Sequence, residues 1–168
     1  MFTTAIARAR LAPRRCYAQR ATALLAFATF AVWLPRHYTL GVNVTASLPV
    51  RFFVIHRGER PQRGQYVALR WTGGGPYPAG ALFIKILAGV PGDVVRCQAH
   101  RFFVNDTLMG VAKTVARSGA PLVPGPTGIL PNGHYYVNAP HPDSLDSRYA
   151  LTGWPTDAQI VGRAYALF

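Results

Sequence analysis

The chain has 168 residues, which is enough for one domain and a tail but excludes a machine of several domains. Hydrophobic residues make up 50% of it, so it can build a core and is not an intrinsically disordered protein. Its 18 basic residues outnumber its 6 acidic ones, and the formal net charge is +12. The 16 glycines and 14 prolines predict many turns and argue against a helix bundle.

The positive charge gathers only at the N-terminus, where the first 20 residues include Arg8, Arg10, Arg14, Arg15 and Arg20. Beyond them, basic residues are scattered and form no run of the kind that binds nucleic acid, so we expect no nucleic-acid partner. The five histidines lack the spacing of metal ligands, and no CxxC or HExxH pattern is present. We therefore expect no metal site.

An apolar segment over residues 21–34 follows the basic residues 1–20 and ends at Pro35. Three interpretations fit it: a cleaved signal peptide, a buried core helix, or a membrane anchor. A membrane span needs about 20 residues, so the anchor would cover residues 21–40. We favour the anchor, with residues 1–20 in the cytoplasm by the positive-inside rule and residues 41–168 as a domain outside it.

Short apolar runs separated by glycine and proline predict strands in the remainder of the chain. Asn105-Asp106 predicts a hairpin turn, residues 118–133 a surface loop, and no helix is expected after residue 48. The fold class is therefore mostly β, on a single N-terminal membrane anchor. The predicted strands are residues 50–55, 65–69, 81–87, 93–97, 100–104, 134–137 and 161–167.

Lys85 lies inside an apolar run, Leu82 to Leu87, although nearly all other basic residues are arginines. Burial disfavours the charged form of lysine, and lysine can lose its proton in a protein whereas arginine cannot. Lys85 is therefore a candidate base. The alternative is an edge-strand lysine that points into solvent.

Ser47 is one of only four serines in the chain, and it lies two residues before Pro49. Because Leu48 precedes a proline, the segment is predicted to be extended or turned, which would expose the Ser47 hydroxyl and amide. Thr45 offers a second hydroxyl nearby. The alternative is an ordinary polar linker.

The segment from His141 to Tyr149 holds two of the six acidic residues, Asp143 and Asp146. Asp146 and Arg148 can hydrogen-bond each other and stiffen the loop. Ser144, in the same loop, can reach a neighbouring amine.

Four segments in this order resemble the type I signal peptidase family, serine–lysine proteases held at the membrane. They cover most of residues 43–164. Residues 45–49 are similar to the family's S-x-P segment, residues 57–67 to R-G-D-x-V, residues 85–93 to K-R-x-x-G-x-P-G-D, and residues 143–149 to the box around S-x-D-S-R. The sequence departs from the family at Ile86, where Arg or Lys is usual.

The resemblance implies a role for each matching residue. Ser47 is the nucleophile and Lys85 the general base. Thr45 and the Ser47 amide supply an oxyanion hole, Ser144 orients Lys85, and Asp146 with Arg148 holds the loop that carries Ser144. No metal or cofactor is implied.

The branch of the family is indicated by size and by two short segments. Only about 58 residues separate Lys85 from Asp143, which leaves no room for the large second β-domain of the Gram-negative housekeeping enzymes. Residues 43–45 and 141–142 are more similar to the conjugative-transfer (TraF-type) peptidases. This branch processes pilin precursors, and some of its members join the pilin ends into a circle. The implied protein is a single-pass endopeptidase of the bacterial inner membrane with a periplasmic catalytic domain. Its partners are the membrane and a precursor with a signal peptide or pilin segment. The alternative is an inactive membrane-anchored β-domain that binds or assembles other proteins.

Overall fold

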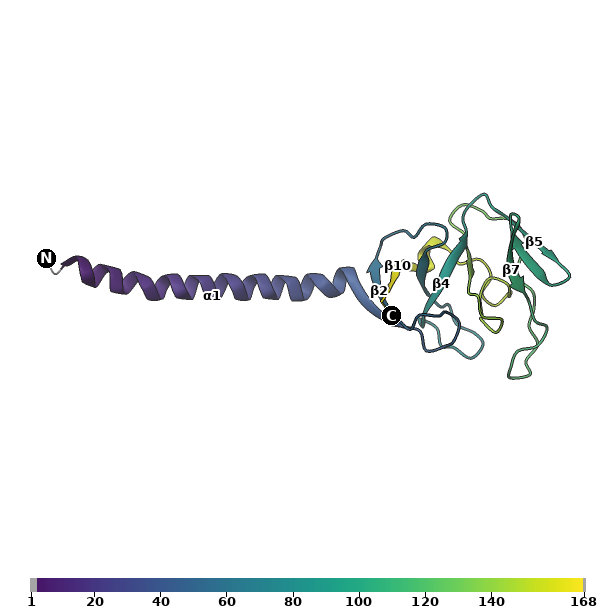
Figure 1. The fold of residues 1–168 in the computed structure, drawn as a ribbon, viewed down its shortest axis with the longest axis horizontal. Coiled ribbons are helices and arrows are strands. Elements are labelled where there is room, and N and C mark those ends of the chain that lie inside the picture. Colours follow the sequence, from purple (N-terminus) through teal and green to yellow (C-terminus); the bar gives the residue numbers. More distant parts are fainter. Residues whose placement is uncertain (1–2, 168) are drawn as a thin grey trace. The chain divides into compact units, whose positions relative to one another are not determined.

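The computed structural model describes residues 3–167, with side chains from residue 17 onward. The chain divides into two units at His37, and each is considered separately. The first is one helix, α1 (Thr3–His37), and the second is a β-domain that begins at Tyr38 (Figure 1). In the described part of the chain, we find no helix with a stretch long and apolar enough to cross a membrane.

The segment at residues 21–40, expected to be the membrane anchor, includes the end of a helix and the beginning of a strand. α1 continues past Pro35 to His37, and β1 (Tyr38–Val42) follows at once, so residues 38–40 belong to a strand. Their backbone pairs with β2 (Phe52–Arg57) from Tyr38 opposite His56 to Val42 opposite Phe52. Residues 17–36 are exposed along the helix, and none of them belongs to a hydrophobic core cluster.

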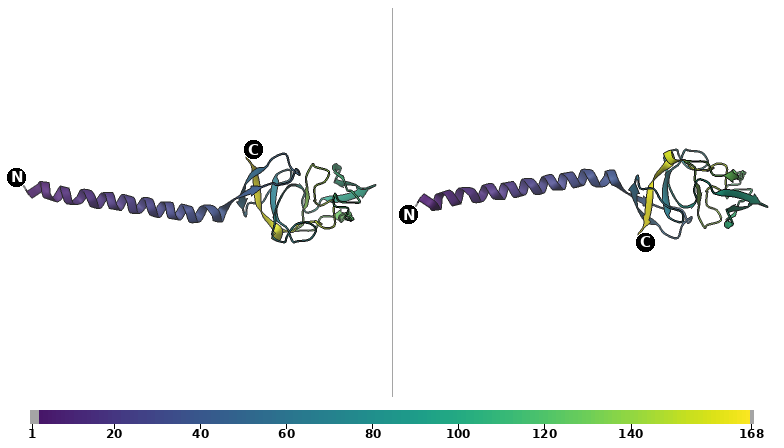
Figure 2. Two further views of the ribbon diagram at one scale, coloured as in Figure 1. Left: turned by 90° about the horizontal axis from the view of Figure 1, so that it is seen from below. Right: turned by 90° about the horizontal axis from the view of Figure 1, so that it is seen from above.

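The β-domain contains two antiparallel sheets, and the larger one has the strand order β1-β2-β10-β3-β4-β9. Its remaining strands are β3 (Tyr66–Arg70), β4 (Leu82–Gly89), β9 (Tyr136–Asn138) and β10 (Ile160–Ala166). β10, the yellow strand near the C-terminus in Figure 2, pairs with β2 on one side and with β3 on the other. The predicted closing strand is thus confirmed, but it is an interior strand of the sheet.

The smaller sheet has the order β7-β6-β5-β8. Its strands are β5 (Val94–Gln98), β6 (Arg101–Val104), β7 (Thr107–Val111) and β8 (Gly128–Ile129). The predicted turn at Asn105-Asp106 joins β6 to β7, and Asn105 adopts the positive φ of 52° that such a turn requires. In the described β-domain, the only helix is the short 3-10 helix η1 (Asp157–Gln159).

Both faces of the larger sheet are packed around β3 and β4. Ala68 and Ile84 lie in one core cluster with Phe53, Ile55 and Ala164. Val67 and Leu87 lie in a second cluster with Leu69 and Val137. Because neighbouring residues of a strand point to opposite faces, this double burial leaves β4 no solvent face. Any polar side chain in the middle of β4 is therefore held inside the domain.

Candidate active site

A cavity of about 320 Å³ lies in the β-domain and is lined by three separate segments of the chain. The first follows β1 and carries Ser47, the second is the start of β4 and carries Lys85, and the third carries Ser144. Tyr77 and Arg117 complete the lining. The fold therefore brings Ser47, Lys85 and Ser144 to one cavity, although 97 positions separate the first from the last.

Ser47 is only 5% exposed, and its hydroxyl is 2.9 Å from the Thr45 hydroxyl. The next residue, Leu48, is 4% exposed and packs in the core cluster around Phe53 and Ile55. Burial of Leu48 fixes the backbone at Ser47, and Pro49 keeps the segment from becoming helical. The interpretation of this segment as an ordinary polar linker is therefore wrong.

Lys85 is in the interior of the sheet, where β4 pairs with β3 on one side and β9 on the other. Its side chain is 6% exposed, and its Nζ lies 2.7 Å from the Ser144 Oγ and 5.8 Å from the centre of the Phe83 ring. An edge-strand lysine in solvent is thus excluded. Burial lowers the pKa of Lys85 to about 8 and outweighs Asp146, which raises it, while Arg148 lowers it further.

The loop that carries Ser144 is stiffened by a buried ion pair. The Arg148 Nε lies 2.9 Å from Asp146 Oδ1, and the Arg148 Nη2 lies 2.9 Å from Asp146 Oδ2. Both side chains are almost wholly inaccessible to solvent. The Asp146 carboxylate also accepts hydrogen bonds from the backbone N–H groups of Ala139 and Arg148. The predicted Asp146–Arg148 contact is confirmed.

Arg148 also connects this loop to the smaller sheet. Its Nη1 donates to the carbonyl of Val111, and its Nη2 donates to the carbonyls of His141 and Ser144. The guanidinium passes close to Gly110, where a Cβ atom would lie 2.8 Å from Nη1. The missing side chain at Gly110 thus leaves room for Arg148 to hold the backbone at both ends of the Ser144 turn.

Several residues near the cavity were not predicted from the sequence. Asp143 pairs with Lys113 and with the Arg117 Nε at 3.2 Å, and the hydrogen bond from Lys113 lowers the pKa of Asp143. Asn43 accepts hydrogen bonds from the hydroxyls of Thr45 and Ser47. Asn43 precedes Ser47 by four positions, but no spacing rule identifies an asparagine in a loop as a partner of a hydroxyl.

The segment at residues 57–67, and the end of the segment at residues 85–93, contribute to the framework of the domain. Asp93, which closes the segment that begins at Lys85, is 8% exposed and accepts a hydrogen bond of 2.8 Å from Arg63. Glu59 receives hydrogen bonds from Arg163 and Tyr165 of β10 and pairs with His56 of β2. These contacts hold loops to strands and lie away from the residues that line the cavity.

This arrangement can support acyl transfer. A hydroxyl becomes a nucleophile when a base takes its proton, and a buried amine with a pKa of about 8 is such a base near neutral pH. In the described residues, no hydrogen bond joins Ser47 to Lys85: Ser47 is bonded to Thr45 and Lys85 to Ser144. Catalytic hydrogen bonds are often loose without substrate, and both groups line one cavity.

The chain is similar to known signal peptidases. It is 29% identical to signal peptidase I U of Bacillus subtilis strain 168 over 117 residues, which cover 60% of this chain and 62% of that protein. It is 30% identical to signal peptidase I of Pseudomonas fluorescens over 152 residues, which cover 68% of this chain and 51% of that protein. The chain thus spans between about half and three fifths of these relatives.

A solved structure and a family model complete the comparison. The crystal structure of a signal peptidase I from Enterococcus faecalis V583 matches 66% of this chain and 98% of its own chain, with 21% identity and a TM-score of 0.41. The family model described as signal peptidase, peptidase S26, matches residues 15–168. Since this match spans most of its length, the chain belongs to the signal peptidase family S26, a family of serine peptidases with a serine–lysine dyad.

Proposed function

We propose that the chain is a serine endopeptidase in which Ser47 is the nucleophile and Lys85 the general base. The observation that carries the proposal is the buried Lys85 amine, which lines the same cavity as Ser47 and is held 2.7 Å from Ser144. Its substrates are precursor proteins that carry a signal peptide or a similar pilin segment. Family membership supports this substrate class.

The first step is attack by the Ser47 Oγ on the carbonyl carbon of the scissile peptide bond. As the carbon–oxygen bond forms, the Ser47 proton passes to the neutral Lys85 Nζ. Burial of Lys85 supports this role because it keeps part of the amine population unprotonated near neutral pH. Ser144 accepts a hydrogen bond from the amine and so directs it within the cavity.

The attack places a negative charge on the carbonyl oxygen, which requires hydrogen-bond donors fixed beforehand. In the proposal, the Ser47 backbone N–H and the Thr45 hydroxyl are these donors. The Thr45 hydroxyl is 2.9 Å from the Ser47 Oγ, so it lies beside the atom that becomes bonded to the substrate carbon. A group at this position can turn toward the oxygen that develops on that carbon.

The intermediate then collapses, the carbon–nitrogen bond breaks, and Lys85 returns the proton to the leaving amine. An ester between Ser47 and the substrate remains. Water attacks this ester in hydrolysis, and Lys85 takes the proton of the water as it attacks. The bond between the acyl carbon and the Ser47 Oγ then breaks, and Lys85 returns the proton to Oγ. A free amine at the N-terminus of the same pilin chain can replace the water, and the product is then a circle.

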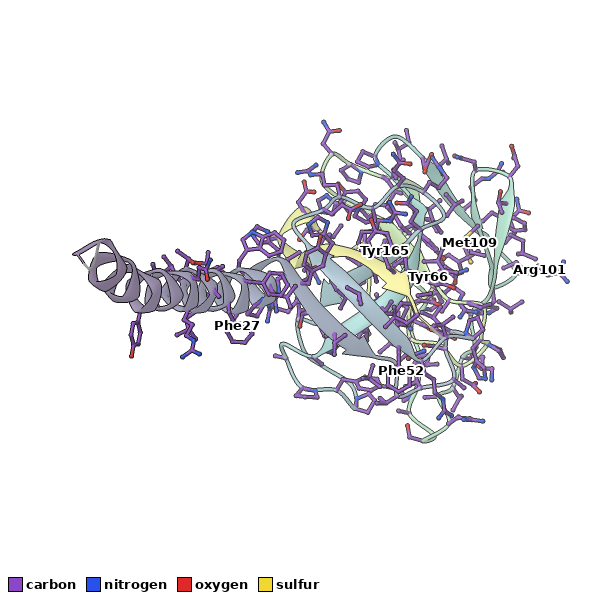
Figure 3. The ribbon with its side chains drawn as sticks, turned by 60° about the vertical axis from the view of Figure 1, so that its left-hand side comes forward. Phe27, Phe52, Tyr66, Arg101, Met109 and Tyr165 are labelled. Atoms are coloured by element: carbon purple, nitrogen blue, oxygen red, sulfur yellow. The ribbon has the colours of Figure 1, made fainter. Side chains whose placement is uncertain are left out.

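In the same proposal, the enzyme acts at the outer face of the bacterial inner membrane. Residues 21–37 attach it to the membrane, and residues 1–20 lie in the cytoplasm. Support comes from the apolar side chains exposed on α1, among them Leu24 (69%), Leu25 (68%) and Phe27 (70%). Phe27 projects from the helix in Figure 3. Exposed apolar surface of this kind favours contact with lipid.

One experiment tests the function. The full chain, purified in detergent, is incubated with a conjugative pilin precursor and, in parallel, with a secretory precursor, and the products are measured by intact-mass spectrometry. We expect cleavage that Ser47→Ala abolishes, and a cyclised pilin appears 18 Da lighter than its linear product. If neither precursor changes in mass, the chain is instead an inactive β-domain that binds or assembles other proteins.

A further inference from the structure

We propose that Asn43 is a positioning residue that acts through Thr45: its side-chain amide holds the Thr45 hydroxyl beside Ser47. This inference rests on the proposed function, since it concerns the same nucleophile. The sequence gives Asn43 no role beyond its place before Thr45. The structure places its side chain within the hydroxyl network of the cavity.

Four contacts fix the Asn43 side chain. Its Oδ1 is 3.0 Å from the Thr45 hydroxyl, 3.4 Å from the Thr45 backbone nitrogen and 3.4 Å from the Ser47 hydroxyl. Its Nδ2 is 3.5 Å from the carbonyl oxygen of Val50. The Asn43 backbone N–H also donates to the carbonyl of Arg51 at 2.8 Å. The asparagine therefore joins both ends of the loop that carries Ser47.

The amide oxygen can only accept hydrogen bonds, whereas each hydroxyl can donate one and accept others. Asn43 Oδ1, Thr45 Oγ1 and Ser47 Oγ lie within 3.4 Å of one another. The Thr45 hydroxyl donates to Asn43 Oδ1, at 3.0 Å, or to Ser47 Oγ, at 2.9 Å, and the Ser47 hydroxyl donates to Asn43 Oδ1 at 3.4 Å. Asn43 Oδ1 is therefore an acceptor for both hydroxyls and holds Thr45 Oγ1 beside Ser47 Oγ.

This arrangement has a consequence for catalysis. Thr45 is exposed at the cavity, and the structure gives its hydroxyl no partners except Asn43 and Ser47 among the described residues. Without Asn43, the threonine side chain is free to rotate away from Ser47. A small displacement of a catalytic group can lower a rate about a hundredfold. Asn43 thus keeps the second oxyanion donor in place before the substrate arrives.

The test compares variants of the full chain in detergent with a cleavable pilin precursor peptide. Asn43→Leu keeps the approximate shape and removes the hydrogen bonds, and Asn43→Ala serves as the second variant if the leucine disturbs folding. We expect kcat to fall about ten- to a hundredfold with KM changed less than threefold. The matched control is Asn132→Leu, at an exposed asparagine in the turn before β9 that does not line the cavity, and it keeps the wild-type rate.

A double-mutant cycle separates positioning from a structural role. In the Thr45→Val background, the Thr45 hydroxyl is already absent, so Asn43→Leu should lower kcat less than threefold further. Equal losses in both backgrounds, a loss confined to KM, or no loss in the single variants would overturn the inference. If the wild-type chain itself fails to cleave the peptide, the proposed function fails instead, so the two failures are distinct.

Discussion

The rise of the rate on the acid side of the pH–rate profile is the most direct measure of the pKa of Lys85. With a pKa of about 8 instead of 10.5, the amine is neutral in about one tenth of the molecules at pH 7, against about one in three thousand for an ordinary lysine. In the proposed mechanism turnover requires the neutral amine, so kcat should rise about tenfold from pH 7 to pH 9 and then level off.

Two substitutions at Lys85 complete this prediction. Lys85→Arg keeps the positive charge but supplies no base, so it should abolish turnover as fully as Ser47→Ala does. Lys85→Met should be equally inactive and well folded, because an apolar side chain of similar length suits the core around β4. The assay is cleavage of a precursor peptide at saturating concentration, with folding checked by circular dichroism.

The same burial predicts how stability depends on pH. Between pH 8 and 10.5 the unfolded chain binds the Lys85 proton more fully than the folded chain, so the unfolding free energy should rise with pH in this window. Below pH 8 the folded chain carries the full cost of the buried charge. The difference in pKa corresponds to about 3 kcal/mol at most. Lys85→Met should therefore be more stable than the wild type at pH 7, and its advantage should disappear by pH 10.5.

Either of two results would refute the reasoning about Lys85. One is a Lys85→Arg variant that cleaves at the wild-type rate. The other is a rate that stays flat from pH 7 to 9 and rises only near pH 10, because the lysine would then titrate as it does in water.

Further predictions concern the supporting residues and the topology. Thr45→Val should lower kcat about 10²- to 10³-fold, as loss of one oxyanion donor does, while Thr45→Ser keeps most activity; equal rates for Val and Thr would remove the hydroxyl from the mechanism. Asp146→Asn should lower the unfolding free energy, measured in urea, by about 3–5 kcal/mol because it leaves Arg148 charged and buried. Lys113→Arg, at an exposed ion pair, should change the rate less than twofold in the same peptide assay. A reporter enzyme that works only outside the cytoplasm, fused at the C-terminus, should be active; activity of a cytoplasmic reporter there would contradict the proposed topology.

The strands of the β-domain were largely predictable, because each combines β-branched or aromatic residues with nearby glycine or proline. Within the larger sheet, β2, β3, β4 and β10 begin and end within about two residues of their predicted limits. β1 was not predicted, since it continues directly from the apolar helix and its identity as a strand depends on pairing with β2. β8 has only two residues and is defined by its bonds to β5.

The residues of the candidate site were predictable where a polar or charged side chain stands out from apolar neighbours in the sequence. A lysine in an apolar run, as at Lys85, is conspicuous in any sequence. Asn43 and Asp143 are not, because their importance comes from partners that the fold brings to them. Asp143 meets Lys113 and Arg117 only when the loop around residue 117 folds back to the cavity. Such contacts across 30 positions leave no local pattern in the sequence.

The site uses the two basic residue types for opposite purposes. Arg148 must stay charged. Its planar guanidinium donates hydrogen bonds to both carboxylate oxygens of Asp146 and, at the same time, to three backbone carbonyls. A lysine at position 148 would have fewer donors and would tend to lose its charge on burial. In the proposed mechanism Lys85 must lose its proton, and an arginine at position 85 would be a buried charge that cannot neutralise. Under that proposal, similar burial gives Arg148 the role of a structural anchor and Lys85 that of a base, which is a reason for a lysine at position 85 in a chain so rich in arginine.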